Sequence, residues 1–199
     1  FNFLQVHYKL KKYKHLIVSP HYTNNAVVRM INKEIENRNA GLPSGIRLKL
    51  NAITNFRMIE KLDEASCEGV PIQMIVRGIC CLIPGVKGMR ENIEVISIVD
   101  KYLEHPRVYI FENGGAPKIY LSSADFMTRN IENRVEVAVP IYDKVLQEEI
   151  LDVFEIAWKD NVKARKINGL EQNVFVNNKA EEVRSQWKIH EYYNEKSRS

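Results

Sequence analysis

Apolar residues along the chain follow the spacing of strands in some segments and of helices in others. Residues 46–51, IRLKLN, are apolar at every second position, which predicts a strand with one buried face. Residues 70–76, VPIQMIV, are apolar at almost every position, which favours a strand buried on both faces, as in parallel sheets. The same reasoning predicts strands over 15–20, 94–99, 107–111, 118–122 and 134–141.

Other segments have the helical spacing. The pattern predicts helices over 24–38, 55–67, 143–158 and, within an irregular tail, 180–193. Phe56 and Val145 belong to the apolar stripes of the second and third helices, so both side chains are expected to face the core. Gly69 stands where the second helix should end. Strands separated by helices favour an α/β layer architecture with a largely parallel sheet.

Composition narrows the class of protein. Hydrophobic residues make up 45% of the 199 positions and charged residues 27%, which excludes disorder as the main state of the chain. No apolar run approaches the roughly 20 residues that span a bilayer. Three cysteines, of which Cys80 and Cys81 are adjacent, are too few for a disulfide framework and indicate a reducing compartment. Because the chain begins without Met and without a signal sequence, we expect an excised piece of a longer protein.

Charge is distributed unevenly. Residues 1–50 hold nine Lys/Arg against two Asp/Glu, whereas residues 51–158 hold eleven against seventeen. A basic opening segment attracts polyanions such as nucleic acid, phosphate chains or an acidic membrane surface. A solvated basic face explains the same charges, and charge alone leaves both interpretations open.

Polar residues follow several predicted strands, where ligands usually bind in open α/β sheets. Lys49–Asn51 end one strand, and Arg77–Gly78 follow another. Arg77 offers a fixed fork of donors that suits phosphate or carboxylate, although a structural ion pair is an equal alternative. His105 precedes a predicted strand with Arg107 two residues on, a pair that can hold an anion. A lone histidine is nevertheless more often structural or exposed than catalytic.

The loop SSADFMTRN, residues 122–130, combines two hydroxyls, a carboxylate, an arginine and an amide directly after a strand. That mixture suits the binding of phosphate oxygens, whereas a capped loop would use Asp125 and Asn130 for turns instead. The sequence contains no Walker A pattern, no Rossmann glycine pattern and no Cys/His set with metal-ligand spacing.

Two long stretches make the chain resemble a known family. VRGICCLIPGVKGMRENIEVISIVDKYLEHPRVYIFENGG and IYLSSADFMTRNIENRVEVAVPI resemble the C-terminal part of bacterial polyphosphate kinases. The resemblance implies a C-terminal phospholipase D-like catalytic domain over residues 1–165, and a tail over 166–199 that is partly helical and packs on the same domain. The implied fold is α/β, a phospholipase D-like sandwich whose sheet is largely parallel or mixed and flanked by helices.

The resemblance also implies an activity, namely the reversible transfer of the terminal phosphate of ATP to polyphosphate with Mg²⁺ as cofactor. In the family, the histidine that becomes phosphorylated and the arginines associated with magnesium lie in the preceding domain. We therefore expect no metal ligands in this chain, and no activity of this chain alone. By the resemblance, Arg77, His105 and Arg129 bind ATP and its phosphates, with His105 as the catalytic residue. Arg107, in the place of the lysine of the phospholipase D motif H-x-K, and Ser123 match less well.

The implied partners are ATP or ADP, inorganic polyphosphate, the preceding domain and further copies of the whole enzyme, with no nucleic acid. The implied location is the cytoplasm, and a peripheral position at the inner membrane face is also open. The first alternative is a non-enzymatic polyanion-binding module, which the basic opening segment favours. A second alternative is a phosphodiesterase of the phospholipase D type, which needs two H-x-K units where this chain offers one altered unit.

Overall fold

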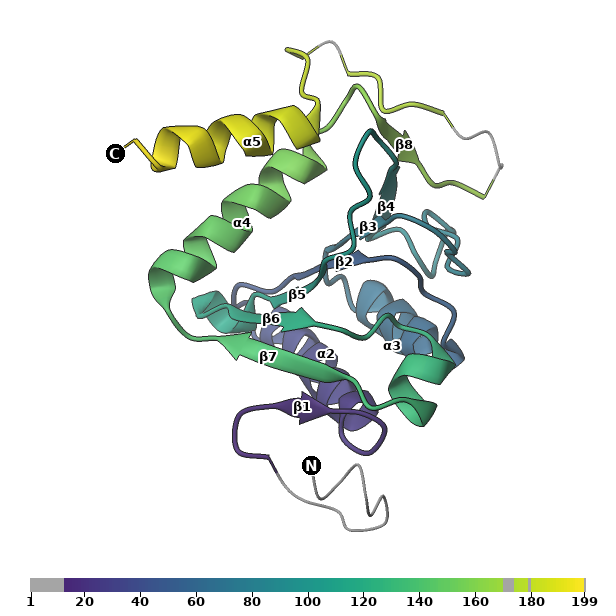
Figure 1. Cartoon of the computed structure of the whole chain (residues 1–199). Helices are drawn as coiled ribbons and strands as arrows, with labels where there is room; N and C mark the ends of the chain where they lie inside the picture. Colours follow the sequence, from purple (N-terminus) through teal and green to yellow (C-terminus); the bar gives the residue numbers. More distant parts are fainter. Residues whose placement is uncertain (1–12, 170–173, 179, 199) are drawn as a thin grey trace.

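A mixed β-sheet forms the centre of the molecule (Figure 1). The computed structural model describes residues 13–169, 174–178 and 180–198, and within them eight strands form this one sheet. Its strands, in chain order, are β1 (Ile17–Val18), β2 (Ile46–Leu50), β3 (Ile72–Val76), β4 (Ile93–Ile98), β5 (Arg107–Phe111), β6 (Lys118–Ser122), β7 (Val137–Ile141) and β8 (Ala164–Lys166). In space they lie in the order β1-β7-β6-β5-β2-β3-β4-β8.

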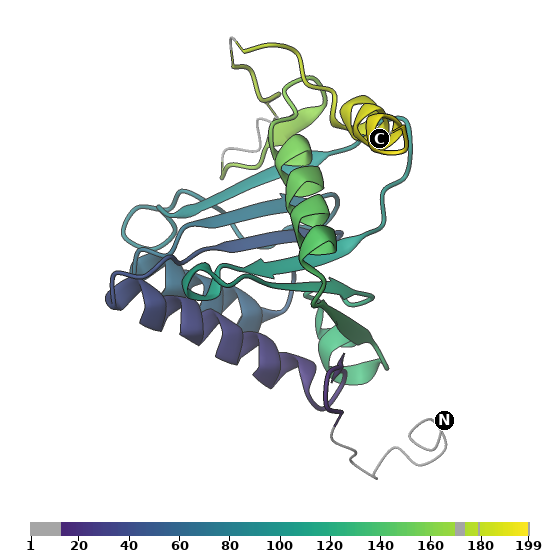
Figure 2. The same cartoon turned by 90° about the vertical axis from the view of Figure 1, so that its left-hand side faces the viewer.

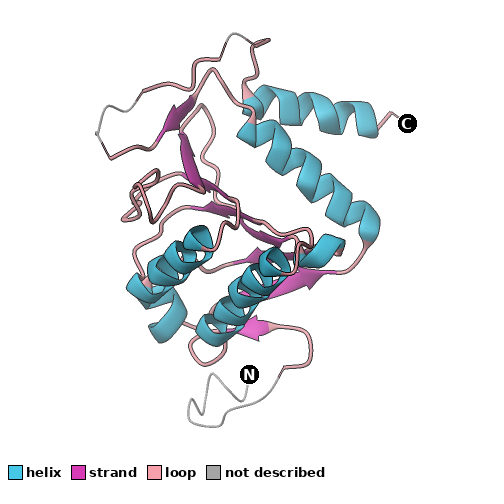
Figure 3. Ribbon diagram, turned by 180° about the vertical axis from the view of Figure 1, so that it is seen from behind, coloured by secondary structure: helices cyan, strands magenta, loops and turns pink. Residues whose placement is uncertain are grey.

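Helices cover both faces of this sheet. They are α2 (Thr23–Asn39), α3 (Phe56–Cys67), α4 (Lys144–Trp158) and α5 (Ser185–Lys196), with the short turns η1 (Asn113–Gly115) and η2 (Arg129–Asn133). The pair α2 and α3 lies on one face, α4 crosses the other, and α5 follows at the end of α4 (Figures 2 and 3). Among the described residues, no helix has both the length and the apolar character needed to cross a bilayer.

Strand direction differs across the sheet. The neighbours β2, β3 and β4 are parallel, whereas β5, β6 and β7 are each antiparallel to the strand beside them. The mixed sheet is therefore confirmed, and the parallel arrangement is limited to the three adjacent strands β2, β3 and β4. The segment between β5 and β6 is a short turn in which Gly114 and Gly115 have positive φ angles, and so short a connection can join only antiparallel neighbours.

Two hydrophobic clusters lie on opposite faces of the sheet. Successive residues of β5 alternate between them: Val108 and Ile110 pack with Phe154 of α4, whereas Tyr109 and Phe111 pack on the side of α2 and α3. Because side chains of a strand point alternately to its two faces, an apolar residue at each of these positions buries both faces of β5.

The predicted elements agree with the structure except at their ends. Gly69, with a φ of +81°, follows the end of α3 as expected. Phe56 and Val145, however, are 73% and 62% exposed, so the expectation that they face the core is wrong. Both lie in the first turn of a helix, ahead of the residues that contact the sheet. The strand β8 was not predicted, because its sequence ARK has no apolar alternation.

Candidate functional site

The candidate site lies at the edge of the sheet where β2, β3 and β6 end and β5 begins. Arg107, the first residue of β5, pairs with Ser122, the last residue of β6. Since β2 and β3 are parallel, Asn51 and Arg77 leave the sheet at the same edge, directly after the two strands. The start of the antiparallel β5 lies beside the end of β2. Four chain segments therefore meet at this edge.

Asp125 connects these segments. Its Oδ2 atom accepts a hydrogen bond from Arg107 at 2.7 Å, and its Oδ1 atom accepts from the backbone N–H groups of Asn51 at 2.7 Å and Ala52 at 3.2 Å. The side-chain oxygen of Asn51 in turn accepts from Nε of Arg77 at 2.9 Å. A continuous series of contacts thus runs from Arg107 through Asp125 and Asn51 to Arg77.

The ion pair between Arg107 and Asp125 is largely removed from solvent, with side-chain exposures of 11% and 7%. Burial alone would raise the pKa of Asp125, but the hydrogen bonds from Arg107 and from the backbone N–H groups of Asn51 and Ala52 outweigh it and hold the pKa below its ordinary value. The carboxylate is therefore ionised at neutral pH and offsets much of the charge of Arg107.

His105 lies against Arg107 and is exposed to solvent. The two terminal guanidinium nitrogens of Arg107 are 2.9 Å from Nδ1 and 3.2 Å from Nε2 of the imidazole. A neutral imidazole has one acceptor nitrogen, so Arg107 donates to one ring nitrogen at a time. Arg107 consequently fixes the orientation of the ring, which stays accessible to a ligand.

Arg77 is half-buried at the end of β3. Its carbonyl oxygen accepts a hydrogen bond from the Ser97 hydroxyl at 3.2 Å, and Nε is used by Asn51. Within the described part of the chain, its two terminal nitrogens have no hydrogen-bond partner. Gly78 is required next to it, because a Cβ atom there would lie 2.9 Å from the Asn51 carbonyl oxygen. The Arg77 guanidinium is therefore held in place through Nε, and its two terminal nitrogens are free to donate hydrogen bonds.

The 122–130 loop contributes Asp125 to this edge, but its other polar groups are used differently. The Ser123 hydroxyl donates to Glu136, and the side-chain amide of Asn130 donates to Glu136 at 2.6 Å. These residues fix the loop against the start of β7. Arg129 is exposed on η2, and no contact within the described residues joins it to Arg77 or His105. The structure thus joins Arg77, His105 and Asp125, and leaves Arg129 outside this series of contacts.

The tail also supports the segment that leads to His105. Glu104 accepts hydrogen bonds from Lys49 at 2.5 Å and from Gln186 of α5 at 3.0 Å. Arg184 forms a two-point ion pair with Asp100 at 2.6 and 2.8 Å. Sequence reasoning singled out Lys49 as a strand end but missed these partners, which lie more than 50 positions away in sequence and carry no motif.

The donor set at this edge does not fit a magnesium ion. In the ranges that the structure describes, no group of three or more His, Cys, Asp and Glu side chains could hold a metal. Mg²⁺ prefers several oxygen ligands, whereas this edge offers arginines, one imidazole and a carboxylate whose two oxygens already accept hydrogen bonds.

Sequence comparisons point to one family. The family model described as polyphosphate kinase C-terminal domain 2 matches residues 16–186. The polyphosphate kinases of Escherichia coli K12 and Vibrio parahaemolyticus are 47% and 44% identical to the chain over 193 residues. Both alignments cover 96% of this chain but 28% of the relative. The chain thus spans less than a third of the length of these relatives.

Solved structures agree with this family. The polyphosphate kinase of Porphyromonas gingivalis matches with a TM-score of 0.90 and 40% identity, over 93% of this chain and 28% of that one. The phospholipase D family member Nuc of Salmonella typhimurium matches with a TM-score of 0.57 and 17% identity, over 77% of this chain and 97% of that one. The second likeness concerns the fold alone, and it confirms the expected phospholipase D-like α/β fold. The chain belongs to the polyphosphate kinase family, in which it corresponds to C-terminal domain 2.

Proposed function

We propose that this chain forms one side of a polyphosphate kinase site, where it binds the phosphates of ATP. The overall reaction is the reversible transfer of the terminal phosphate of ATP to polyphosphate, through a phosphohistidine supplied by another domain. The observation that carries the proposal is the series of contacts that brings Arg77 and His105 to one edge of the sheet through Asn51, Asp125 and Arg107.

Arg77 supplies positive charge to the phosphates in this proposal. Phosphoryl transfer depends mainly on positioning and on neutralising the charge of the phosphate oxygens. The two free terminal nitrogens of Arg77 form a fork that can donate to two phosphate oxygens at once. Because Asn51 holds Nε at 2.9 Å, little side-chain freedom is lost when the fork binds.

His105 is the catalytic residue of the proposal, and Arg107 positions it. The exposed imidazole contacts a phosphate oxygen and either donates a proton to the leaving oxygen or only orients it. Arg107 forms an ion pair with Asp125, and its terminal nitrogens lie against both ring nitrogens of His105. The role of Arg107 is therefore to hold the imidazole ring in place. Arg129 binds the phosphates from its exposed place on η2, which stays a prediction.

Other features of the whole enzyme also stay predictions. They are the Mg²⁺ cofactor, the phosphohistidine domain, the homo-oligomer and the cytoplasmic location, with or without contact to the inner membrane face. The division of this chain at residue 165 is a further one, and β8 spans that boundary.

A polyanion-binding module without enzymatic activity is the second candidate, and the charge of the opening segment favours it. Residues 1–12, which carry three of the nine Lys and Arg residues of that segment, lie outside the described residues. Such a module would bind polyphosphate through many loose phosphate contacts. Its affinity would therefore fall steeply with salt, and it would not prefer ATP.

Calorimetric titration of the chain with ATP and with long-chain polyphosphate, at about 50 and 200 mM salt, separates the two candidates. We expect saturable ATP binding that Arg77→Gln weakens and that Lys87→Gln, an exposed charge in the 77–92 loop, leaves unchanged. Binding of polyphosphate alone, lost at the higher salt and equally reduced by both variants, would contradict the kinase proposal and support the binding module.

A further inference from the structure

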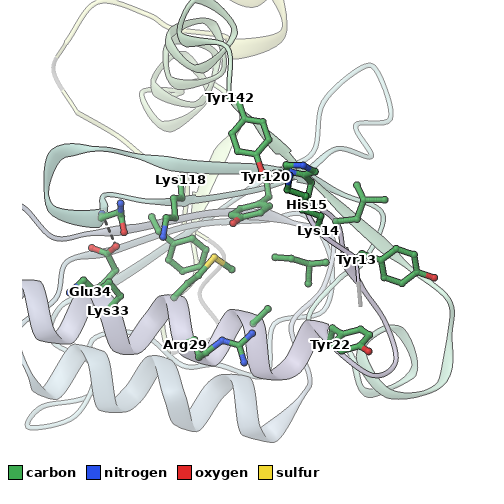
Figure 4. A pocket seen from close by; sticks show the side chains of 16 residues that line it. Tyr13, Lys14, His15, Tyr22, Arg29, Lys33, Glu34, Lys118, Tyr120 and Tyr142 are labelled. Carbon is green, nitrogen blue, oxygen red and sulfur yellow. Dashed lines mark hydrogen bonds between the residues drawn. The ribbon is translucent and has the colours of Figure 1, made fainter. Parts of the chain in front are cut away.

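A cavity of about 590 Å³ lies between α2, the strand β6 and the segment before β1 (Figure 4). Phe111 of β5 and Lys118 of β6 are paired neighbours, and both line this cavity. The candidate site lies at the opposite end of the same two strands, where Arg107 pairs with Ser122. Its lining includes the basic and aromatic residues Lys14, Arg29, Lys33, Lys118, Tyr120 and Tyr142.

Arg29 and Lys118 line the cavity from two different walls, with Lys118 extending from the sheet toward α2 and Arg29 lying along α2 (Figure 4). Arg29 comes from α2, Lys118 comes from β6, and both are exposed. Within the described part of the chain, neither side chain has a hydrogen bond or an ion pair. Lys33, by contrast, is paired with Glu36 at 3.0 Å. Two positive charges therefore face a common space without a bound counter-charge, which an anion would supply.

The carboxylate in the cavity lining, Glu34, forms hydrogen bonds with backbone groups and not with the cations of the cavity. Glu34 is fully buried, and its two oxygens accept hydrogen bonds from the backbone N–H groups of Gly45 at 3.0 Å and Asn113 at 2.7 Å. Burial raises the pKa of Glu34 above its ordinary value, although these hydrogen bonds and the charge of Lys118 act against the rise. Glu34 thus fixes the turn after β5 and does not hold Lys118.

Tyrosine side chains complete the cavity. Nδ1 of His15 lies 3.0 Å from the Tyr142 hydroxyl, and the two rings meet edge to face with their centroids 5.7 Å apart. This contact fixes the segment before β1 at the end of β7. Burial and the neighbouring Tyr142 raise the pKa of Tyr120, so its hydroxyl is protonated at neutral pH and can donate a hydrogen bond.

We infer that this cavity binds an anion with several phosphoryl groups, either a free oligophosphate or the phosphate tail of a nucleotide. A ligand with charge at several positions can meet the guanidinium of one wall and the ammonium of the other, and the Tyr120 hydroxyl in the same lining can donate a further hydrogen bond. The volume lies in the range of ligand pockets. The inference goes beyond the proposed function, because this second site neither shares residues with Arg77 and His105 nor depends on phosphoryl transfer.

Lysine acylation followed by mass spectrometry tests the site on the chain itself. The rate of modification of Lys118 is measured with no ligand, with tripolyphosphate and with ATP, and Lys87 serves as the control lysine. At a tripolyphosphate concentration ten times Kd, we expect Lys118 to react roughly tenfold more slowly and Lys87 to react at its original rate. Slowing by ATP as well would assign the nucleotide tail as a ligand, and slowing by tripolyphosphate alone would assign free oligophosphate.

Variants separate this site from the edge of the sheet. Arg29→Gln should raise the tripolyphosphate concentration that protects Lys118 by roughly tenfold, and Arg38→Gln, on the same helix outside the cavity, should leave it unchanged. Protection should persist in Arg77→Gln, even if the proposed kinase function is wrong. The inference is overturned if Lys118 reacts at one rate throughout, if Lys118 and Lys87 are slowed alike, or if Arg29→Gln has no effect.

Discussion

The two basic regions of this molecule differ in how their charges are held. At the edge of the sheet, Arg77 and Arg107 are tied to Asn51 and Asp125, which are themselves fixed by strand ends. In the cavity beside α2, Arg29 has no partner within the described residues. Donors that are fixed before a ligand arrives can stabilise the charge that develops during a reaction. Cations without fixed partners can attract and bind an anion, but they contribute less to stabilising a transition state. The comparison therefore favours chemistry at the edge, as in the proposed function, and binding alone in the cavity.

The largest expected effect is on turnover, through His105. His105→Ala in a complete polyphosphate kinase that carries this domain should lower kcat by about 10²–10⁴-fold, with a smaller change in KM for ATP, if the imidazole transfers a proton. Steady-state kinetics of ATP consumption and polyphosphate formation measure both constants. Near-normal kinetics would mean that the ring is structural, and the edge would lose its catalytic residue.

His105→Gln separates the two roles of the ring. Glutamine keeps a hydrogen-bonding side chain but cannot carry the proton. Recovery of most of the activity lost in His105→Ala would make His105 a positioning residue. A loss as large as that of His105→Ala would instead support proton transfer.

The next effect is on stability, through Asp125. Asp125→Ala removes the partner of the buried Arg107 and the acceptor of two backbone N–H groups, so it should lower the free energy of unfolding by about 3–5 kcal/mol. Urea unfolding of the chain measures this loss. Glu60→Ala, an exposed carboxylate of α3, is the control and should change stability by less than about 0.5 kcal/mol. Equal values for both variants would show that the edge is not pre-organised.

Arg77→Gln should have a more moderate effect, mainly on KM for ATP. In the proposed site it removes a cation that contacts phosphate both before and during the transfer, so KM for ATP should rise by roughly 10–100-fold and kcat should also fall. The same kinetic assay with Lys87→Gln gives the effect of losing one positive charge elsewhere. If both variants behave alike, the role of Arg77 is only general electrostatic attraction.

Acid should reduce the contribution of Asp125 to the stability of the folded chain. The folded pKa of Asp125 lies below its ordinary value, because hydrogen bonds from Arg107 and two backbone groups outweigh burial. Its contribution to stability is present above the unfolded pKa of about 3.9 and is lost as the pH falls through the folded pKa. The stability difference between the wild-type chain and Asp125→Asn, from urea unfolding between pH 6 and about pH 3, should therefore shrink on acidification. A constant difference would contradict the assignment.

The smallest effect is expected at Arg129. Its side chain is exposed on η2, so Arg129→Gln should change the free energy of unfolding by less than about 0.5 kcal/mol. A change in KM for ATP without a change in stability would support its predicted phosphate contact. Unchanged kinetics would remove Arg129 from the site.

The sequence predicts the fold well where burial is regular. The strands β2 and β3 are recognisable because alternation or continuous apolarity follows from which faces are covered. It cannot predict β8, whose residues Ala164–Lys166 join the sheet through backbone pairing with β4 rather than through an apolar pattern. It also misplaces Val145, because periodicity does not show where the contact of a helix with the sheet begins.

The sequence predicts the candidate site only in part. Strand ends indicate Arg77, and the resemblance adds His105, but the link through Asp125 depends on the antiparallel pairing of β5 and β6. The short glycine-containing turn between these strands is the signal that could have placed residues 105–107 beside residues 122–125. No sequence signal groups Arg29 with Lys118, since 89 positions separate them and they meet only across a cavity.

The most direct test of the assignment is whether ATP reaches His105. A two-dimensional NMR spectrum of the histidine rings of this chain reports on each ring separately. The signals of His105 report on the edge of the sheet, and those of His190 in α5 serve as the reference. Titration with ATP should shift the His105 signals saturably and leave those of His190 unchanged, and Arg77→Gln should require roughly 10–100-fold more ATP for the same shift. Unshifted His105 signals at ATP concentrations that saturate the calorimetric titration would show that the edge of the sheet does not bind ATP.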